Sequence, residues 1–183
     1  MKNFTLRSER LLLRNLKESD LDDFLLYRSD PEVTKYQGFG VFDKKKAEEF
    51  ILTQKDMEFG LEGEWIQLGI ILISENKLIG DCAVNVRSKK AQIGCTISKK
   101  YQRKGIAKET VLMLMKYLFE EFKVNTIIEA ADEENIASLN LLKSIGFFKN
   151  CLVINGSFIN GEYRNDIRYS LKKKEWEAFK SFF

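Results

Sequence analysis

The chain has 183 residues, of which 44% are hydrophobic and 31% charged, and this composition predicts one packed globular domain over residues 1–183. A net charge of +3 gives no strong field toward nucleic acid, and neither a signal peptide nor an apolar run of about twenty residues is present, so we expect no nucleic-acid or membrane partner. The chain has no histidine and its three cysteines lack metal-like spacing, which predicts no metal site and a reducing, cytoplasmic location.

Local patterns predict an alternating order of helices and strands. The expected elements are a strand at 10–16, a helix from Ser19 or Asp20 to 28, a helix at 44–59, strands at 65–73, 78–86 and 91–97, a helix at 106–122, a strand at 126–131, a helix at 135–145, a hairpin of strands at 148–154 and 162–171 around Asn-Gly turns, and a helix at 174–182. This order predicts an α/β (α+β) fold whose sheet is mixed but mainly antiparallel, with helices on both faces.

Residues 102–107, Gln-Arg-Lys-Gly-Ile-Ala, connect the strand at 91–97 to a long apolar helix. The first turn of a helix leaves about four backbone N–H groups unpaired and carries about half a positive charge, which suits a pyrophosphate. Gly105 lets an anion approach the backbone, and Arg103, Lys104 and Lys108 add positive charge. Taken alone, the loop is equally well a helix start with solvated lysines.

A second motif lies at 135–147, which reads as a capped helix that ends cleanly. Asn135 is a good N-cap, and Gly146 suits the left-handed position after the last turn. Taken alone, Asn135 is a cap and Ser138 a solvated hydroxyl.

Together, the two motifs resemble the GNAT superfamily of N-acetyltransferases. In that family a Gln-x-x-Gly-x-Gly/Ala loop binds the pyrophosphate of acetyl-coenzyme A, and a later Asn-x-x-Ser helix ends in Gly-Phe. The runs at 9–14, 29–36 and 159–171 are similar to the RimJ/RimL branch, which acetylates the N-terminal amine of ribosomal proteins. A run like the last one also occurs in polyamine acetyltransferases, so the resemblance indicates the family more closely than the acceptor.

The resemblance implies that the strand at 91–97 and the following loop bind acetyl-coenzyme A without a metal. The backbone N–H of Cys95 is expected to polarise the thioester carbonyl, and the backbone of Ile97 to pair with a pantetheine amide. The expected coenzyme-binding residues are Cys95, Ile97, Gln102, Arg103, Lys104, Gly105, Ile106, Ala107, Lys108, Asn135 and Ser138. Three of these, Ser138, Asn135 and Cys95, are the catalytic candidates.

Ser138 is the candidate for protonating the leaving thiolate, while Asn135 is expected to bind pantetheine. Many relatives carry a tyrosine one turn beyond this serine, but Leu142 occupies that position. A thiol of this type has a pKa near 8.5, so water is the alternative source of the proton.

The general base is left open by the sequence. Relatives often carry a glutamate on the donor strand, where this chain has Gln92. The remaining candidates for the general base are the carboxylates of Glu129, Asp132, Asp166 and Glu64. We expect deprotonation through ordered water that Asp132 or Asp166 polarises.

The sequence therefore predicts direct transfer of an acetyl group from acetyl-coenzyme A to a primary amine, of a protein N-terminus or a small molecule, in a ternary complex. One alternative is a non-catalytic regulatory protein that binds acyl-coenzyme A on the same fold, and another is a polyamine or antibiotic acetyltransferase. The acceptor pocket is expected at 30–42, 60–65 and 158–164, in a monomer or homodimer.

Overall fold

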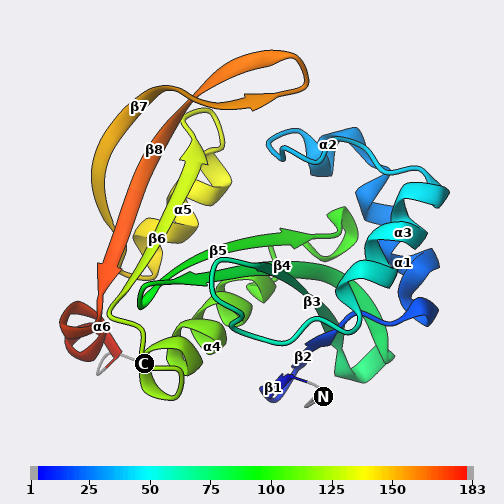
Figure 1. Cartoon of the computed structure of the whole chain (residues 1–183), viewed down its shortest axis with the longest axis horizontal. Coiled ribbons are helices and arrows are strands. Elements are labelled where there is room, and N and C mark those ends of the chain that lie inside the picture. Colours follow the sequence, from blue (N-terminus) through cyan, green and yellow to red (C-terminus); the bar gives the residue numbers. More distant parts are fainter. Residues whose placement is uncertain (1–3, 181–183) are drawn as a thin grey trace.

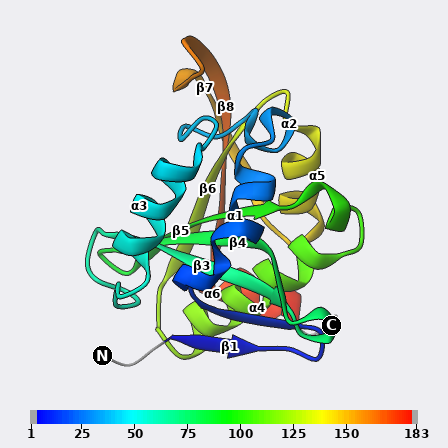
Figure 2. The same ribbon diagram turned by 90° about the vertical axis from the view of Figure 1, so that its right-hand side faces the viewer.

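The computed structural model describes residues 4–180, which form one eight-stranded sheet with helices on both faces (Figure 1, Figure 2). The strands are β1 (Thr5–Arg7), β2 (Leu11–Asn15), β3 (Trp65–Leu72), β4 (Lys77–Arg87), β5 (Lys90–Ile97), β6 (Thr126–Asp132), β7 (Phe148–Ile159) and β8 (Glu162–Lys172). The helices are α1 (Leu21–Arg28), α2 (Pro31–Thr34), α3 (Lys44–Gln54), α4 (Ile106–Glu120), α5 (Ile136–Ser144) and α6 (Lys173–Phe179), with short 3-10 turns at Glu18–Asp20, Ile73–Glu75 and Lys99–Tyr101. The predicted fold class is confirmed.

The strand order is β1-β2-β3-β4-β5-β6-β8-β7, and all neighbours are antiparallel except β5 and β6. These two parallel strands pair only from Lys90–Thr126 to Gln92–Ile128. Beyond Gln92, β5 stays paired with β4, and β6 stays paired with β8. We call the region where β5 and β6 no longer pair the split, and it leaves one edge of β5 without a neighbouring strand.

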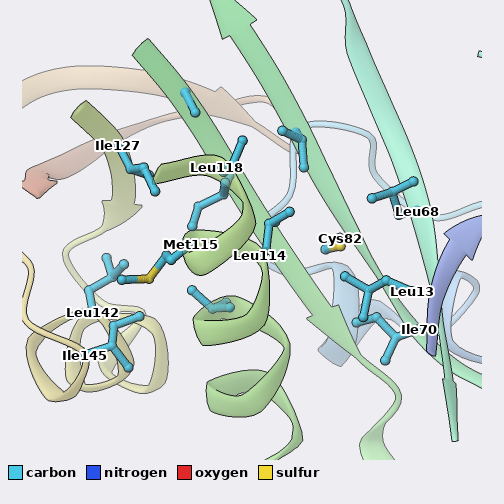
Figure 3. Packing of buried hydrophobic residues seen from close by; sticks show 14 of the residues in the cluster. Leu13, Leu68, Ile70, Cys82, Leu114, Met115, Leu118, Ile127, Leu142 and Ile145 are labelled. Atoms are coloured by element: carbon cyan, nitrogen blue, oxygen red, sulfur yellow. The ribbon is translucent and has the colours of Figure 1, made fainter. Parts of the chain in front are cut away.

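The main core lies between the sheet and α4, which follows the split in the chain. Leu114, Met115 and Leu118 of α4 are buried at helical spacing and point toward the sheet and α5 (Figure 3). Ile127 of β6 and Ile145 after α5 belong to the same buried cluster. This packing fixes the position of the N-terminus of α4 relative to β5 and β6.

The opposite face of the sheet carries α1 and α3, and a buried ion pair between Arg28 and Asp81 fastens α1 to β4. Asp81 of β4 is fully buried and accepts hydrogen bonds from Arg28 Nε at 2.9 Å, from Tyr27 Oη at 2.7 Å and from Gln67. Arg28 also donates to Gln37, whose Nε2 donates to Thr96 Oγ1 at 2.7 Å. The network thus connects the helix α1, and the loop after α2, to β5.

The helix predicted at 44–59 ends earlier, at Gln54. Tertiary contacts hold the rest of that segment: Asn15 Nδ2 donates to the Met57 carbonyl at 2.8 Å, and the Phe59 ring stacks on Phe4 with centroids 4.1 Å apart. Short elements β1 and α2 were not predicted, because three or four residues carry too little periodicity. The predicted helix at 174–182 ends at Phe179, and residues 181–183 lie outside the described part.

The closing hairpin turns at one of its two Asn-Gly pairs. Asn160 and Gly161 adopt positive φ angles of 52° and 85° and form the two-residue turn between β7 and β8. The earlier pair lies inside β7, where the register shifts between Val153 and Ser157. This bulge is why β7 continues to Ile159 instead of ending at the predicted residue 154.

We predict that Asp81→Asn lowers the free energy of unfolding by about 3–5 kcal/mol, because it leaves the Arg28 guanidinium buried without a counter-charge. The matched control is Glu48→Gln on α3, whose carboxylate lies 3.9 Å from Lys44 Nζ on the surface, and it is expected to cost less than about 1 kcal/mol. Urea unfolding of both variants checks this. Equal losses in the two variants would show that the buried charge pair does not hold α1 to β4.

Candidate active site

The exposed edge of β5 presents backbone groups of alternate residues to the split. Ser98 N–H donates to the Ile79 carbonyl at 2.9 Å, so Ser98 faces β4. Because backbone groups alternate along an antiparallel strand, those of Ile97, Cys95 and Ile93 face the other way, toward the split. The backbone N–H of Cys95 therefore faces the split and not β4.

The Cys95 side chain is unsuited to a nucleophilic role. Burial raises the pKa of its thiol to about 12, and the negative charges of Asp81 and Glu129 act in the same direction. The thiol therefore stays protonated near neutral pH, and only a thiolate is a good nucleophile. This leaves the backbone of Cys95 as the part that can serve the reaction.

A carboxylate from β6 lies in the split beside the same edge. Glu129 follows the last paired residue of β6, and its Oε2 accepts a hydrogen bond from Ile93 N–H at 3.2 Å. Burial raises the pKa of this carboxyl to about 8. Sequence reasoning ranked Glu129 with three other acids, although its place just past the paired part of the strand distinguishes it.

The other three carboxylates lie elsewhere. Asp166 belongs to β8, so the whole of β6 separates it from the split, and its pKa is raised by burial and by the nearby charge of Asp132. Asp132 lies opposite Asp166 at the far end of β6. Glu64 is exposed before β3. Among the four candidates, Glu129 is the one with a hydrogen bond to the β5 edge.

The predicted phosphate loop has the expected shape. Gly105 is the N-cap of α4 with φ of 77°, and Arg103 has φ of 59°. Because the N-cap residue is glycine, it offers no side chain to cap the first turn of α4. Such a helix start suits an anion.

Two side chains shape this loop from outside it. Gln102 Nε2 donates to the Ile97 carbonyl at 2.9 Å and so ties the loop to the end of β5. Arg10, before β2, lies with Nη1 3.5 Å from the Lys104 carbonyl and pairs with Glu109 of α4. Arg10 was not predicted, because only the fold brings the β1–β2 turn next to residues 104–109.

The helix α5 begins as predicted. Asn135 Oδ1 accepts a hydrogen bond from Ser138 N–H at 3.2 Å, so its side chain caps the helix. Ser138 is half-buried in the first turn, which directly follows β6 and the split. Leu142 is buried in the core. The hydroxyl of Ser138 is therefore the proton-carrying group that this first turn offers.

Two hollows lie on the face of the sheet that α1 and α3 cover, one toward each end of the split. The first, of about 460 Å³, is lined by Gly63, Trp65, Asn85, Arg87, Ser88, Lys90, Ala91, Gln92 and Ile128. The second, of about 190 Å³, is lined by Asp132, Glu133, Glu134, Glu162, Tyr163, Arg164 and Asn165. Parts of the predicted acceptor segments 60–65 and 158–164 line them, and Tyr36, from segment 30–42, donates to the Glu134 carbonyl at 3.3 Å.

Comparison with known proteins identifies the family. The family model described as "Acetyltransferase (GNAT) domain" matches residues 10–148, and the chain belongs to this family. An uncharacterised N-acetyltransferase, p20, of Bacillus licheniformis is 34% identical over 176 residues, covering 94% of this chain and 98% of p20. The chain is thus an enzyme of the N-acetyltransferase class, whose family uses acetyl-coenzyme A as cosubstrate.

Comparison with solved structures supports the same family. A GNAT acetyltransferase from Bacillus anthracis matches with a TM-score of 0.84 and 26% identity over 93% of this chain and 99% of its own. A Vibrio cholerae structure named as a "putative ribosomal-protein-serine acetyltransferase" matches with a TM-score of 0.73 and 25% identity over 92% and 97% of the two chains. These similarities are consistent with the predicted RimJ/RimL-like branch. Among residues 4–180, no helix is long and apolar enough to span a membrane.

We predict that coenzyme A raises the melting temperature of the wild type, since a ligand that binds only the folded state at a hundredfold excess over its Kd stabilises it by about 2.7 kcal/mol. Gly105→Asp should abolish this shift, because it sets a carboxylate against the pyrophosphate. Gly63→Asp is the matched control, because Gly63 has a similar φ of 81° but lies outside the loop. A full shift in the Gly105 variant would mean that the loop is only a helix start.

Proposed function

We propose that this enzyme transfers the acetyl group of acetyl-coenzyme A directly to a primary amine, of a protein N-terminus or a small molecule, within a ternary complex. The observation that carries the proposal is the split: it joins a free edge of β5, the Glu129 carboxylate and the phosphate loop in one continuous stretch. A protein acceptor is supported by the Vibrio cholerae structure, which is named as a putative ribosomal-protein-serine acetyltransferase.

The donor would be held along β5, as a peptide adds to the edge of a sheet. The loop at 102–107 and the first turn of α4 would take the pyrophosphate, with Arg103, Lys104 and Lys108 around it. Ile97 would offer its N–H to pantetheine, because its carbonyl already accepts from Gln102. Asn135 would add a pantetheine contact through its side chain.

The acetyl carbonyl would accept a hydrogen bond from the Cys95 N–H. This donor is fixed by the β4–β5 ladder, so it stabilises the developing oxyanion without reorganising. The acceptor amine would enter from the sheet face that holds the two hollows and attack the carbonyl carbon. Direct attack is favoured over an acetyl-cysteine intermediate because the Cys95 thiol stays protonated.

Glu129 is assigned as the general base, in place of water polarised by Asp132 or Asp166. Its carboxylate would first accept a proton from the acceptor ammonium, and the free amine would then attack the carbonyl carbon to form the new C–N bond. As the C–S bond breaks, the electron pair would leave on the coenzyme A sulfur, and the nitrogen would release its second proton to solvent. Ser138 would donate a proton to that thiolate and be replenished from solvent. The products are an N-acetylated amine and free coenzyme A.

The absence of a carboxylate from the strand at 91–97 slightly favours the alternative of a regulatory protein that binds acyl-coenzyme A without catalysis. Glu129 removes this argument, because the carboxylate comes from the neighbouring strand and still hydrogen-bonds to the donor edge. Detection of free coenzyme A, released in the presence of a panel of amines, tests the proposed function. Binding of acetyl-coenzyme A without release of coenzyme A to any amine would contradict it.

We predict that kcat/KM rises with pH through an inflection near 8, because Glu129 accepts a proton only when ionised and burial raises its pKa to about 8. The acceptor chosen for this measurement should have an amine pKa near 10.4, so that its own titration lies well above that of Glu129. Glu129→Gln should lose this inflection and about 10²–10⁴-fold of the rate.

Asp166→Asn is the control for this experiment and should cost less than about tenfold, since Asp166 does not reach the split. If the inflection near 8 persists in Glu129→Gln, or if Asp166→Asn is the more damaged variant, Glu129 is not the base.

We predict that Ser138→Ala lowers kcat by roughly ten- to a thousandfold with little change in coenzyme A affinity, since it removes one proton donor to the leaving group. Ser144→Ala, at the exposed end of α5, is the matched control and should retain the wild-type rate. Steady-state kinetics at neutral pH measures both. Unchanged turnover in Ser138→Ala would assign the proton to water.

A further inference from the structure

The second hollow is strongly acidic. Among its seven lining residues are the four carboxylates Asp132, Glu133, Glu134 and Glu162, against the single guanidinium of Arg164, which gives a net charge of −3. Arg164 lies 3.0 Å from Glu134 Oε2 and 3.2 Å from Glu162 Oε2. One cation is thus shared by several anions, and the excess negative charge remains.

One of these carboxylates is buried, and one of its two oxygens lacks a hydrogen-bond partner among the described residues. The side chain of Asp132 is 2% exposed, and its Oδ2 makes no hydrogen bond within the described residues. Arg164 Nη1 lies 4.0 Å from this oxygen, which is beyond hydrogen-bond distance. An unpaired carboxylate oxygen in such a place is costly, and a cation that entered the hollow would remove this cost.

The hollow is held in shape by its own backbone and side chains. Asp132 Oδ1 accepts from Glu134 N–H at 2.8 Å. Glu133 N–H donates to the Asn165 carbonyl at 2.9 Å, and Asn165 Nδ2 donates to Glu133 Oε1 at 2.7 Å. The loop before α5 and the start of β8 are therefore braced together, which holds the residues that line the hollow in place.

The hollow lies near the point where the acceptor amine would react. Asp132 is three residues beyond Glu129 on the same strand, which corresponds to roughly 10 Å along β6. Its side chain lies on the sheet face from which the acceptor enters, as does Ile128 of the first hollow. Among residues 4–180, no three His, Cys, Asp or Glu side chains converge as a metal site would require, so an ammonium or guanidinium group fits better than a metal ion.

We infer that this hollow binds a second positive charge of the acceptor, which therefore carries a cationic group roughly 10 Å from the amine that is acetylated. The inference rests on the proposed function and narrows it to multiply charged amines. The same chemistry has two sources, a polyamine or a peptide whose basic side chain follows its N-terminus. Asp132 and Glu162 are the residues that select such acceptors.

The test compares acceptors that differ only in the second charge. Release of coenzyme A is measured with 1,7-diaminoheptane and with octylamine, in which a methyl group replaces the second ammonium, and with two short peptides that carry either lysine or the uncharged norleucine after an N-terminal alanine. Each is run with the wild type, Asp132→Asn, Glu162→Gln and the control Glu49→Gln, which removes an equal charge from the exposed surface of α3. Binding of spermidine is measured separately by calorimetry in the presence of coenzyme A.

We expect the doubly charged member of at least one pair to be preferred by roughly ten- to a hundredfold in kcat/KM, mainly through KM and less at high salt. Asp132→Asn and Glu162→Gln should each reduce this preference, while Glu49→Gln should preserve it. The preferred pair identifies the source, polyamine or basic peptide. Equal turnover within both pairs, or a preference that survives both variants, overturns the inference but leaves the acetyltransferase function intact, whereas no turnover of any amine contradicts the function itself.

Discussion

The structure depends on one constraint, which is that β5 is paired on one side and released on the other. Backbone N–H and C=O groups need partners, so a strand edge without a neighbour is a place where a ligand can supply them. Here the edge is released after only three residue pairs with β6, and it runs directly into the anion-binding start of α4. In the proposed function, this one backbone feature would align the thioester, pantetheine and pyrophosphate positions.

Keeping the split open requires that both strands be held from outside it. The eight register pairs with β4 hold β5, and the network from Asp81 through Arg28 and Gln37 reaches it at Thr96. On the other side, β6 is paired along its length with β8 and packed against the core under α4. The side chain of Glu129 extends from β6 into the split. Its low-dielectric surroundings raise its pKa into the range that suits a base.

The long periodic elements and the two motifs could be predicted from sequence, because they depend on local patterns: apolar spacing in α4, the Asn135 cap and the left-handed Gly146. Features that depend on tertiary contact could not. Arg10 reaches the phosphate loop only because β1 and β2 form an edge hairpin. The helix α3 ends at Gln54, and the segment after it is held by tertiary contacts such as the stacking of Phe59 on Phe4. From the sequence, Glu129 was one of four candidate carboxylates, and Asp132 or Asp166 was expected to act through ordered water. The place of Glu129 became clear only because the parallel pairing ends one residue before it.

The central claim is that the backbone N–H of Cys95 donates a hydrogen bond to the acetyl carbonyl in the split. The chain has three cysteines, so ¹⁵N-cysteine labelling gives three backbone amide signals, with Cys82 on the neighbouring strand and Cys151 in the β7–β8 hairpin as internal references. The account predicts that a non-transferable ketone analogue of acetyl-coenzyme A moves the Cys95 amide proton downfield relative to coenzyme A alone, while Cys82 and Cys151 change little. A Cys95 signal that is identical with the two saturating ligands would contradict it.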